Sequence, residues 1–346
     1  MEKTRVQTGR VRVLRNVVLW STFAVAAIYA LGAYSSKMVD GMLAPDEVIA
    51  PRTPSEADVL LSTSIRQLES LESLSADVEF ESEFFGEKYY GRGRYAQAAL
   101  PRSFAARRSP FEATRFLLQA NLSSSSVEDA KKKARGEGNF LTVVCDCDAR
   151  AWWRYTSVEG VKTLYRIDID DLRARLMQLD SDDMEKLRQN GVPNLNCGLD
   201  GLPGLGGLAG LLKRVDAYYD LDPEYEKIKS PKGDDLLKIT GRVKQKFWDH
   251  AKTTLQVTEF EPYLLENIPT NVEIYFGSSR VFPYRIRFYS AYETEGGVKT
   301  HEVFAASYEP NSQTITPDDF RFDQPQSTFE HAEGAYIEKL IPGVKL

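Results

Sequence analysis

The most reactive side chains in this sequence belong to three cysteines and three histidines. Cys145 and Cys147 lie one residue apart in the stretch "TVVCDCDARAWWRY", and Cys197 follows much later in a glycine-rich segment. The histidines stand apart from the cysteines and from one another: His250, His301 and His331. A structural zinc site needs about four ligands at paired spacings, and a cysteine nucleophile needs a histidine as its base. The spacing therefore predicts neither a metal site nor a Cys/His catalytic pair.

The cysteines are better suited to a structural bridge. In an extended strand Cys145 and Cys147 point to the same face, and they are too close in sequence for a comfortable mutual disulfide. If the domain is exported, Cys197 can pair with Cys145 or with Cys147, and one thiol remains. The sequence leaves both pairings open.

Two further motifs have part of the pattern of a cofactor or metal site. Gly204, Gly206 and Ala209 have the spacing of a dinucleotide fingerprint, but the residues before them read as a loop instead of a buried strand. The acidic runs at residues 168–171 and 180–183 lack the glycine and the terminal glutamate of a calcium loop. The sequence therefore predicts no cofactor, no metal and no catalytic residue, and we expect a protein that is not an enzyme.

Composition and charge narrow the class of protein further. The chain has 346 residues, of which 42% are hydrophobic, so it can bury a sizeable core. Its net charge is −6, and without residues 1–37 it has 38 basic and 49 acidic residues, a charge of −11. A nucleic-acid binder needs a basic face to neutralise phosphates. We therefore expect no nucleic-acid partner.

The N-terminal segment predicts export. Residues 1–16 form a basic tail, and residues 17–37 hold an uncharged apolar run of 18 residues, "VVLWSTFAVAAIYALGAY". Such a run is at the lower end of the length that spans a membrane, and its basic flank should stay in the cytoplasm. A cleaved signal peptide is the rival interpretation, but the run is longer than a signal core and Leu31 disturbs the cleavage pattern. We favour a single-pass anchor in the inner (cytoplasmic) membrane, with the following domain in the periplasm or another extracytoplasmic space.

The rest of the chain divides into a linker and one domain. Residues 38–54 carry three prolines and read as a spacer, and residues 55–346 form the domain. Residues 55–74 have the apolar spacing of an amphipathic helix, and residues 77–84 then alternate between apolar and acidic side chains, as in a strand. A helical, glycine-rich insertion is expected at about 168–222.

Many short strands favour an α+β fold, a curved antiparallel sheet or half barrel covered by helices. Further strand-like runs are residues 114–121, 140–145, 151–156, 162–167, 235–243, 271–276, 283–289 and 299–308.

The order of these segments resembles the lipoprotein-carrier superfamily, the LolA-like periplasmic proteins. The resemblance is carried by "LESLESLSADVEFESEF", "YYGRGRYAQAALPRSFAARR", "LTVVCDCDARAWWRY" and "ITPDDFRFDQP". In that family a Trp/Tyr strand follows an Asp-Gly turn, and here Asp148 and Ala149 occupy the turn. This sequence departs from the family at Leu100-Pro101, where an arginine tends to precede the proline, and in its insertion and its anchor.

The resemblance implies a non-enzymatic domain that binds a lipid or the acyl chain of an acylated protein at the membrane. Strand parity then selects nine side chains for the apolar cavity: Phe80, Phe84, Tyr95, Phe116, Trp152, Tyr165, Ile274, Ile286 and Phe304. The alternative is an interaction module of the same fold that binds an envelope protein partner or senses envelope stress.

Overall fold

The computed structural model describes most of the domain. The described residues are 53–84, 87–99, 114–132, 138–146, 150–176, 178–179, 207–245, 269–294, 297–323, 329–331 and 333–334. The predicted tail and anchor lie outside them. Within these ranges, no helix has both the length and the apolar composition that crossing a membrane requires.

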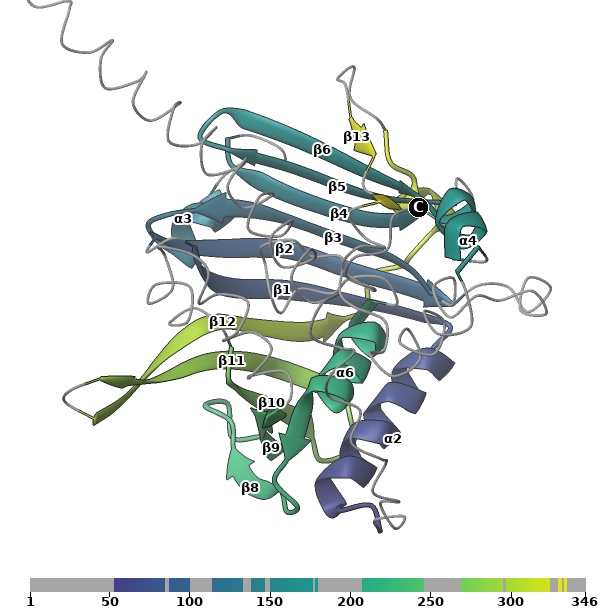
Figure 1. Cartoon of the computed structure of the whole chain (residues 1–346). Helices are drawn as coiled ribbons and strands as arrows, with labels where there is room; N and C mark the ends of the chain where they lie inside the picture. The colour runs from purple at the N-terminus through teal and green to yellow at the C-terminus, as the bar shows by residue number, and fades with distance from the viewer. Residues whose placement is uncertain are drawn as a thin grey trace, which may run out of the picture.

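A single curved sheet forms the frame of the domain (Figure 1). Its strands are β1 (Ser73–Phe84), β2 (Glu87–Ala99), β3 (Thr114–Ser123), β4 (Phe140–Asp146), β5 (Ala151–Val158), β6 (Val161–Asp168), β7 (Tyr219–Leu221), β8 (Glu226–Lys229), β9 (Asp235–Val243), β10 (Asn271–Gly277), β11 (Pro283–Thr294), β12 (Gly297–Asn311) and β13 (Glu330–His331). Their order is β13-β6-β5-β4-β3-β2-β1-β12-β11-β10-β9-β7, with β8 also paired to β9.

The predicted curved, mainly antiparallel sheet is confirmed. Among the described strands, β13 alone runs parallel to its neighbour, β6, so the sheet is mixed. The sheet does not close, because β13 and β7 lie at opposite ends of its order. The eight further runs predicted as strands correspond to β3, β4, β5, β6, β9, β10, β11 and β12.

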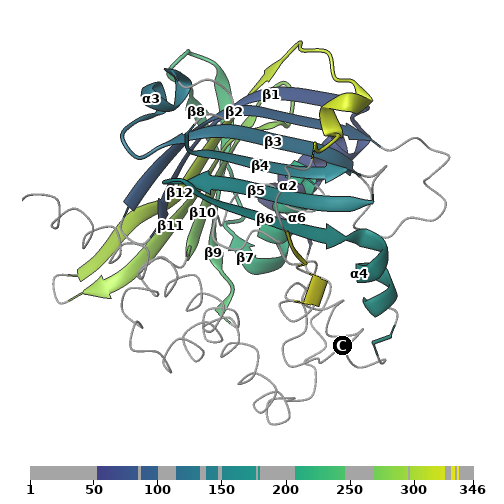
Figure 2. The ribbon, with the colours of Figure 1, turned by 90° about the horizontal axis from the view of Figure 1, so that it is seen from above.

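The two faces of the sheet are used differently. The helices α2 (Glu56–Ser70) and α6 (Gly207–Tyr218) lie inside its curve (Figure 2). Val78 and Phe80 point to this side, which we call the covered face, and they join α2 and α6 in the main core. Asp77 and Glu79 alternate with them and point to the other side, which we call the outer face.

The helix α2 is shorter than predicted. Ser55 caps it, accepting from the Asp58 N–H at 3.1 Å while the Asp58 carboxylate accepts from the Ser55 N–H at 2.9 Å. The helix ends at Ser70, Leu71 has extended backbone, and Leu74 already pairs with Gln97 in β2. Pairing of β1 with strands on both of its sides therefore outweighs the local helical spacing.

Three short elements complete the described chain. The helix α3 (Val127–Lys132) packs against β2 and β3, and α4 (Ile169–Leu176) follows β6 directly. After β12, the 3₁₀ helix η3 (Pro317–Phe320), Phe322 and Phe329 cover the outer face of β2–β6, and β13 then pairs with the edge of β6. We call residues 312–323 and 329–331 the C-terminal strap.

The strap explains the paired tryptophans of the opening motif. Successive residues of β5 point to opposite faces, so Trp152 lies in the main core and Trp153 points outward. Trp153 stacks on Phe322 of the strap with ring centroids 5.1 Å apart, and Phe329 meets it edge-on at 5.5 Å. The outer face of this half of the sheet therefore has an apolar cover of its own.

Candidate functional site

The predicted cavity residues gather on the covered face. Seven of the nine have side chains that are at most 2% exposed: Phe80, Tyr95, Phe116, Trp152, Ile274, Ile286 and Phe304. Tyr165 is half-buried against the same cluster, and the Phe84 side chain lies outside the description. The structure thus brings these residues into one apolar layer, and their contact with a ligand stays a prediction.

In this structure the covered face is packed by α2 and α6. The buried side chains of α6 are Leu208, Ala209, Leu211, Leu212 and Val215, and they share the core with the buried residues of α2 and the sheet. Aromatic rings stack along the strands below, as between Phe80 and Phe304 with centroids 6.2 Å apart. A ligand on this face must therefore take the place of helix side chains.

A small polar cluster links α6 to the sheet. The Tyr95 hydroxyl donates to Gln97 Oε1 at 2.7 Å and accepts from the Leu208 N–H at 3.0 Å, at the start of α6. Gln97 Nε2 in turn donates to the Leu68 carbonyl of α2 at 2.9 Å. Burial raises the pKa of Tyr95 well above its ordinary value, so the hydroxyl stays protonated. Both helices are thus held to β2 through two side chains.

Two polar atoms of the same face make no hydrogen bond within the described structure. They are the Tyr308 hydroxyl and Trp152 Nε1, both enclosed by the core. The Tyr308 ring meets Tyr95 edge-on, with centroids 5.9 Å apart. Buried polar groups without partners are rare, so these are positions where a bound polar group would be stabilised.

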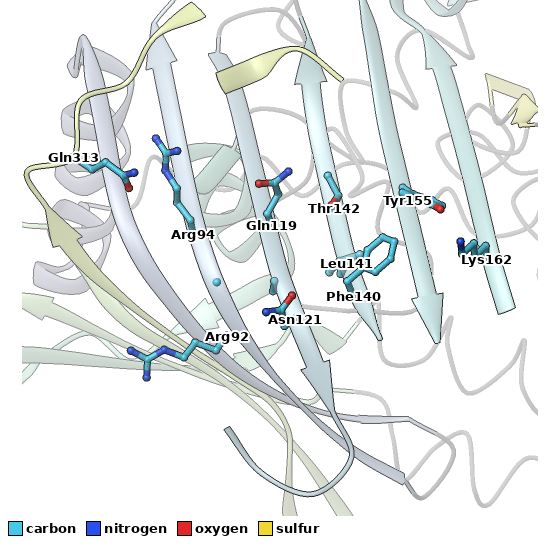
Figure 3. Close-up of a pocket in the computed structure, with 12 residues that line it drawn as sticks. Arg92, Arg94, Gln119, Asn121, Phe140, Leu141, Thr142, Tyr155, Lys162 and Gln313 are labelled. Carbon is cyan, nitrogen blue, oxygen red and sulfur yellow. The ribbon is translucent and has the colours of Figure 1, made fainter. Parts of the chain in front are cut away.

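The outer face carries a hollow that the sequence analysis missed. It has a volume near 560 Å³ and lies across β2–β6 beside the strap (Figure 3). Its lining is Arg92, Gly93, Arg94, Gln119, Ala120, Asn121, Phe140, Leu141, Thr142, Tyr155, Lys162 and Gln313. Arg94, Gln119, Thr142 and Tyr155 form one row, because each lies opposite the next in strand register.

Ion pairs surround this hollow. Arg92 Nη1 donates to Glu79 at 2.5 Å, and Arg94 Nη1 donates to Asp319 of η3 at 2.8 Å. Burial alone would raise the pKa of Asp319, but hydrogen bonds from the Thr316 N–H and from Arg94 outweigh it and lower that pKa. Of the acidic outer row predicted for β1, Glu79 and Glu81 pair with Arg92 and Lys88 of β2.

A signal for the hollow is present in the sequence. In "GRGRY" the arginines alternate with glycines, so both guanidinium groups must emerge on one face of β2. The next strand repeats the pattern with Gln119 and Asn121. Polar residues in phase on adjacent strands indicate a polar surface, but only the register of Arg94 with Gln119 shows that they adjoin.

The remaining predicted groups fall as follows. Cys145 is buried on the covered face, opposite Phe116 and Trp152, while Cys147 and Cys197 lie outside the description. The disulfide therefore stays a prediction. Asp168 caps α4, since its Oδ1 accepts from the Asp170 and Asp171 N–H groups.

No protein-family model matches the chain, and no curated protein matches it. Similar solved structures include a DUF1329 family protein from Desulfovibrio piger, at 11% identity and TM-score 0.30, covering 75% of this chain and 92% of that chain. LprF from Mycobacterium bovis is 8% identical with TM-score 0.31, covering 76% and 97%. A putative outer membrane lipoprotein-sorting protein domain from Vibrio parahaemolyticus is 8% identical with TM-score 0.27, covering 75% and 94%. These TM-scores are too low to assign a fold, so the fold of this chain is described from its own strand pairing.

Proposed function

We propose that this domain is a non-enzymatic, carrier-like binder of lipid or protein acyl chains, and that the covered face holds the chain. The observation that carries the proposal is the continuous apolar layer from β6 to β9, which lies under two helices. Each methylene buried there would contribute about 0.8 kcal/mol. The sequence resemblance to lipoprotein carriers supports the same class of ligand.

In this proposal α6 is the movable cover. Its buried side chains are aliphatic, so an acyl chain can replace them without leaving a charge unpaired. In the described structure its polar links include one at each end: the Leu208 N–H donates to the Tyr95 hydroxyl, and Lys244, next to β9, donates to the Asp216 and Ala217 carbonyls at 2.9 Å. Between these ends, Lys213 forms an exposed ion pair with Glu69 at 2.5 Å. Exposed ion pairs contribute little, so displacement of α6 is opposed mainly by the apolar contacts that the ligand restores.

The neighbouring tryptophans provide a test with an internal control. Brominated acyl chains quench tryptophan fluorescence only at close range, and Trp152 faces the proposed site while Trp153 faces the opposite side. In a full-length background with Trp20 and Trp248 replaced by phenylalanine, we expect Trp153→Phe to keep the quenching and Trp152→Phe to lose it. Equal quenching of both variants, or none of either, would contradict the proposal.

We also propose, from the sequence, that the domain is exported and tethered to the inner membrane by residues 17–37. A tethered domain cannot cross the periplasm as a shuttle, so it would accept or present its ligand at the membrane. The alternative function, a module that binds an envelope protein, is separated by crosslinking in cells. A single stoichiometric protein partner would favour the module, and labelled lipid would favour the carrier-like domain.

A further inference from the structure

The hollow on the outer face has the chemistry of a second ligand site. Arg92, Arg94 and Lys162 line it, and no carboxylate is among its lining residues in the described structure. Glu79 and Asp319 each pair with one arginine through its Nη1 atom, so the hollow keeps the charge of Lys162 and the Arg94 N–H groups that make no hydrogen bond in the described structure. The lining therefore favours a ligand with negative charge.

Arg94 is the residue that specifies the ligand group. Asp319 occupies its Nη1 atom, whereas Nε and Nη2 are buried and make no hydrogen bond in the described structure. These two atoms form the side edge of the guanidinium, whose parallel N–H groups match two oxygens of one phosphate or carboxylate. An oxyanion would accept hydrogen bonds from both of these N–H groups, which have no other acceptor in the described structure.

Gln119 adjoins this fork. It lies opposite Arg94 in the register of β2 and β3, and its Oε1 is also buried without a hydrogen bond in the described structure. Figure 3 shows the two side chains on neighbouring strands. Because no hydrogen bond holds that amide oxygen, the Gln119 side chain can turn as a ligand enters and offer its amide N–H to the same anion.

The rest of the hollow fits a body with hydroxyl groups. Its volume near 560 Å³ lies within the range of small-molecule sites, about 300–1,000 Å³, and is far larger than one phosphate. Thr142 and Tyr155 continue the row from Arg94, and Phe140 meets the Tyr155 ring edge-on with centroids 4.9 Å apart. Hydroxyl groups beside aromatic edges suit a glycerol or sugar body.

We propose that this hollow binds a phosphate ester of a hydroxyl-rich molecule, with Arg94 as the phosphate fork. Lys162, four strands away at the other end of the hollow, adds positive charge to the site. The sheet separates it from the covered face, so its occupant is not the acyl chain of the proposed function. Two sources share this chemistry, a free sugar or glycerol phosphate and the headgroup of an anionic lipid.

Calorimetric titration of the full-length chain in uncharged detergent tests the site with two soluble probes. Glycerol 1-phosphate represents the free ester, short-chain phosphatidylglycerol represents the headgroup, and glycerol alone is the uncharged control. The variants are Arg94→Lys, which keeps the charge but loses the fork, and Lys162→Gln, which changes an exposed side chain. Arg285→Gln is the matched control, because Arg285 is an exposed outer-face arginine on β11 away from the hollow.

We expect Arg94→Lys to weaken the binding of the preferred probe by about tenfold, since two hydrogen bonds to a charged group are lost. Lys162→Gln should weaken it by about threefold and Arg285→Gln by less than about twofold. Preference for either probe identifies the source, and weaker binding of that probe by Arg94→Lys supports the site. Absence of binding by both probes overturns it, as does unchanged affinity in both hollow variants. Trp152 quenching reads the covered face separately, so failure here leaves the acyl-chain test intact.

Discussion

The ring of Phe80 lies across Gly91, its register partner on β2. A Cβ atom built on Gly91 would come within 2.1 Å of Phe80 Cζ, which no side chain tolerates. Because Gly91 has no side chain, the Phe80 ring can lie over it on the covered face, where Phe80 also stacks on Phe304. Aromatic cover of a strand glycine is a known way of fixing sheet register.

Gly91→Ala should therefore destabilise the domain by about 1–3 kcal/mol, as overpacking of a core does. Urea unfolding measures this change, and Gly334→Ala is the control, because nothing lies within 4 Å of a Cβ there. In the double variant with Phe80→Ala the cost should be smaller than the sum of the single costs. Strict additivity would show that the ring does not depend on Gly91.

Tyr95→Phe should loosen α6. The change leaves the Leu208 N–H and Gln97 Oε1 unpaired in the core, which costs about 1–3 kcal/mol. Hydrogen exchange of the α6 amides should become faster. Tyr308→Phe is the control, because the Tyr308 hydroxyl makes no hydrogen bond in the described structure and its loss should cost little. Equal effects of both variants would refute a specific link through Tyr95.

Asp319 should make the domain sensitive to acid. Its pKa is lowered below the ordinary value of 3.8, so the unfolded chain binds its proton first as the pH falls. The stabilisation is therefore complete above pH 3.8 and is lost as the pH falls through the lower folded pKa. Asp319→Asn should reduce stability at neutral pH and flatten its pH dependence in the acid range, measured by urea unfolding.

The exposed neighbour Asp318 gives the control for this experiment. Asp318→Asn should leave the pH dependence close to that of the wild type, because Asp319 is the residue that accepts the hydrogen bond from Arg94. An identical pH profile for Asp319→Asn and the wild type would show that the strap is not held through this carboxylate.

The anchor prediction is tested by replacing Ala26 and Ala27 with arginine. Each arginine at the centre of a membrane helix costs roughly 2.5–3.5 kcal/mol on insertion scales, so the double variant should not insert stably. A reporter active only outside the cytoplasm, fused after Leu346, should work in the wild type and fail in the variant. N-terminal sequencing of the membrane fraction then separates an anchor from a signal peptide, which would leave a mature chain beginning near Ser35.

Much of the sheet was predictable because alternation is a local property. The alternation at residues 77–84 indicates which side chains lie on each face of that strand. The strand β9 has the predicted bounds, Asp235–Val243. The end of α2 was not predictable, because Leu74 satisfies the helical spacing and the strand equally well. Only its long-range pairing with Gln97 decides between them.

The outer face shows the same limit. The alternation at residues 77–84 predicts an acidic face for that strand alone, whereas on β3 and β4 Leu117 and Val144 of the same outer face are buried beneath Phe320 of the strap. The strap lies far from these strands in the sequence, and no residue pattern within β3 or β4 indicates that the strap will pack on them. For the same reason the hollow beside it, which needs five strands in register, could not be located from any one of them.

The order of strands has a consequence for how the chain matures. Each of the strands β1–β6 pairs with the strand that follows it in the chain. The second neighbour of β1 is β12, which is synthesised last of the long strands, so this pair can form only late. Because translation delivers the N-terminal half first, this central edge stays open for most of the process, and open edges invite association with other chains. Ala76 and Val78 of β1, which meet Pro310 and Tyr308, lie on that edge. Pairing of β1 with β12, which joins the two half-sheets, is thus the slow, long-range step of folding. Before this step a chaperone could bind the exposed edge of β1.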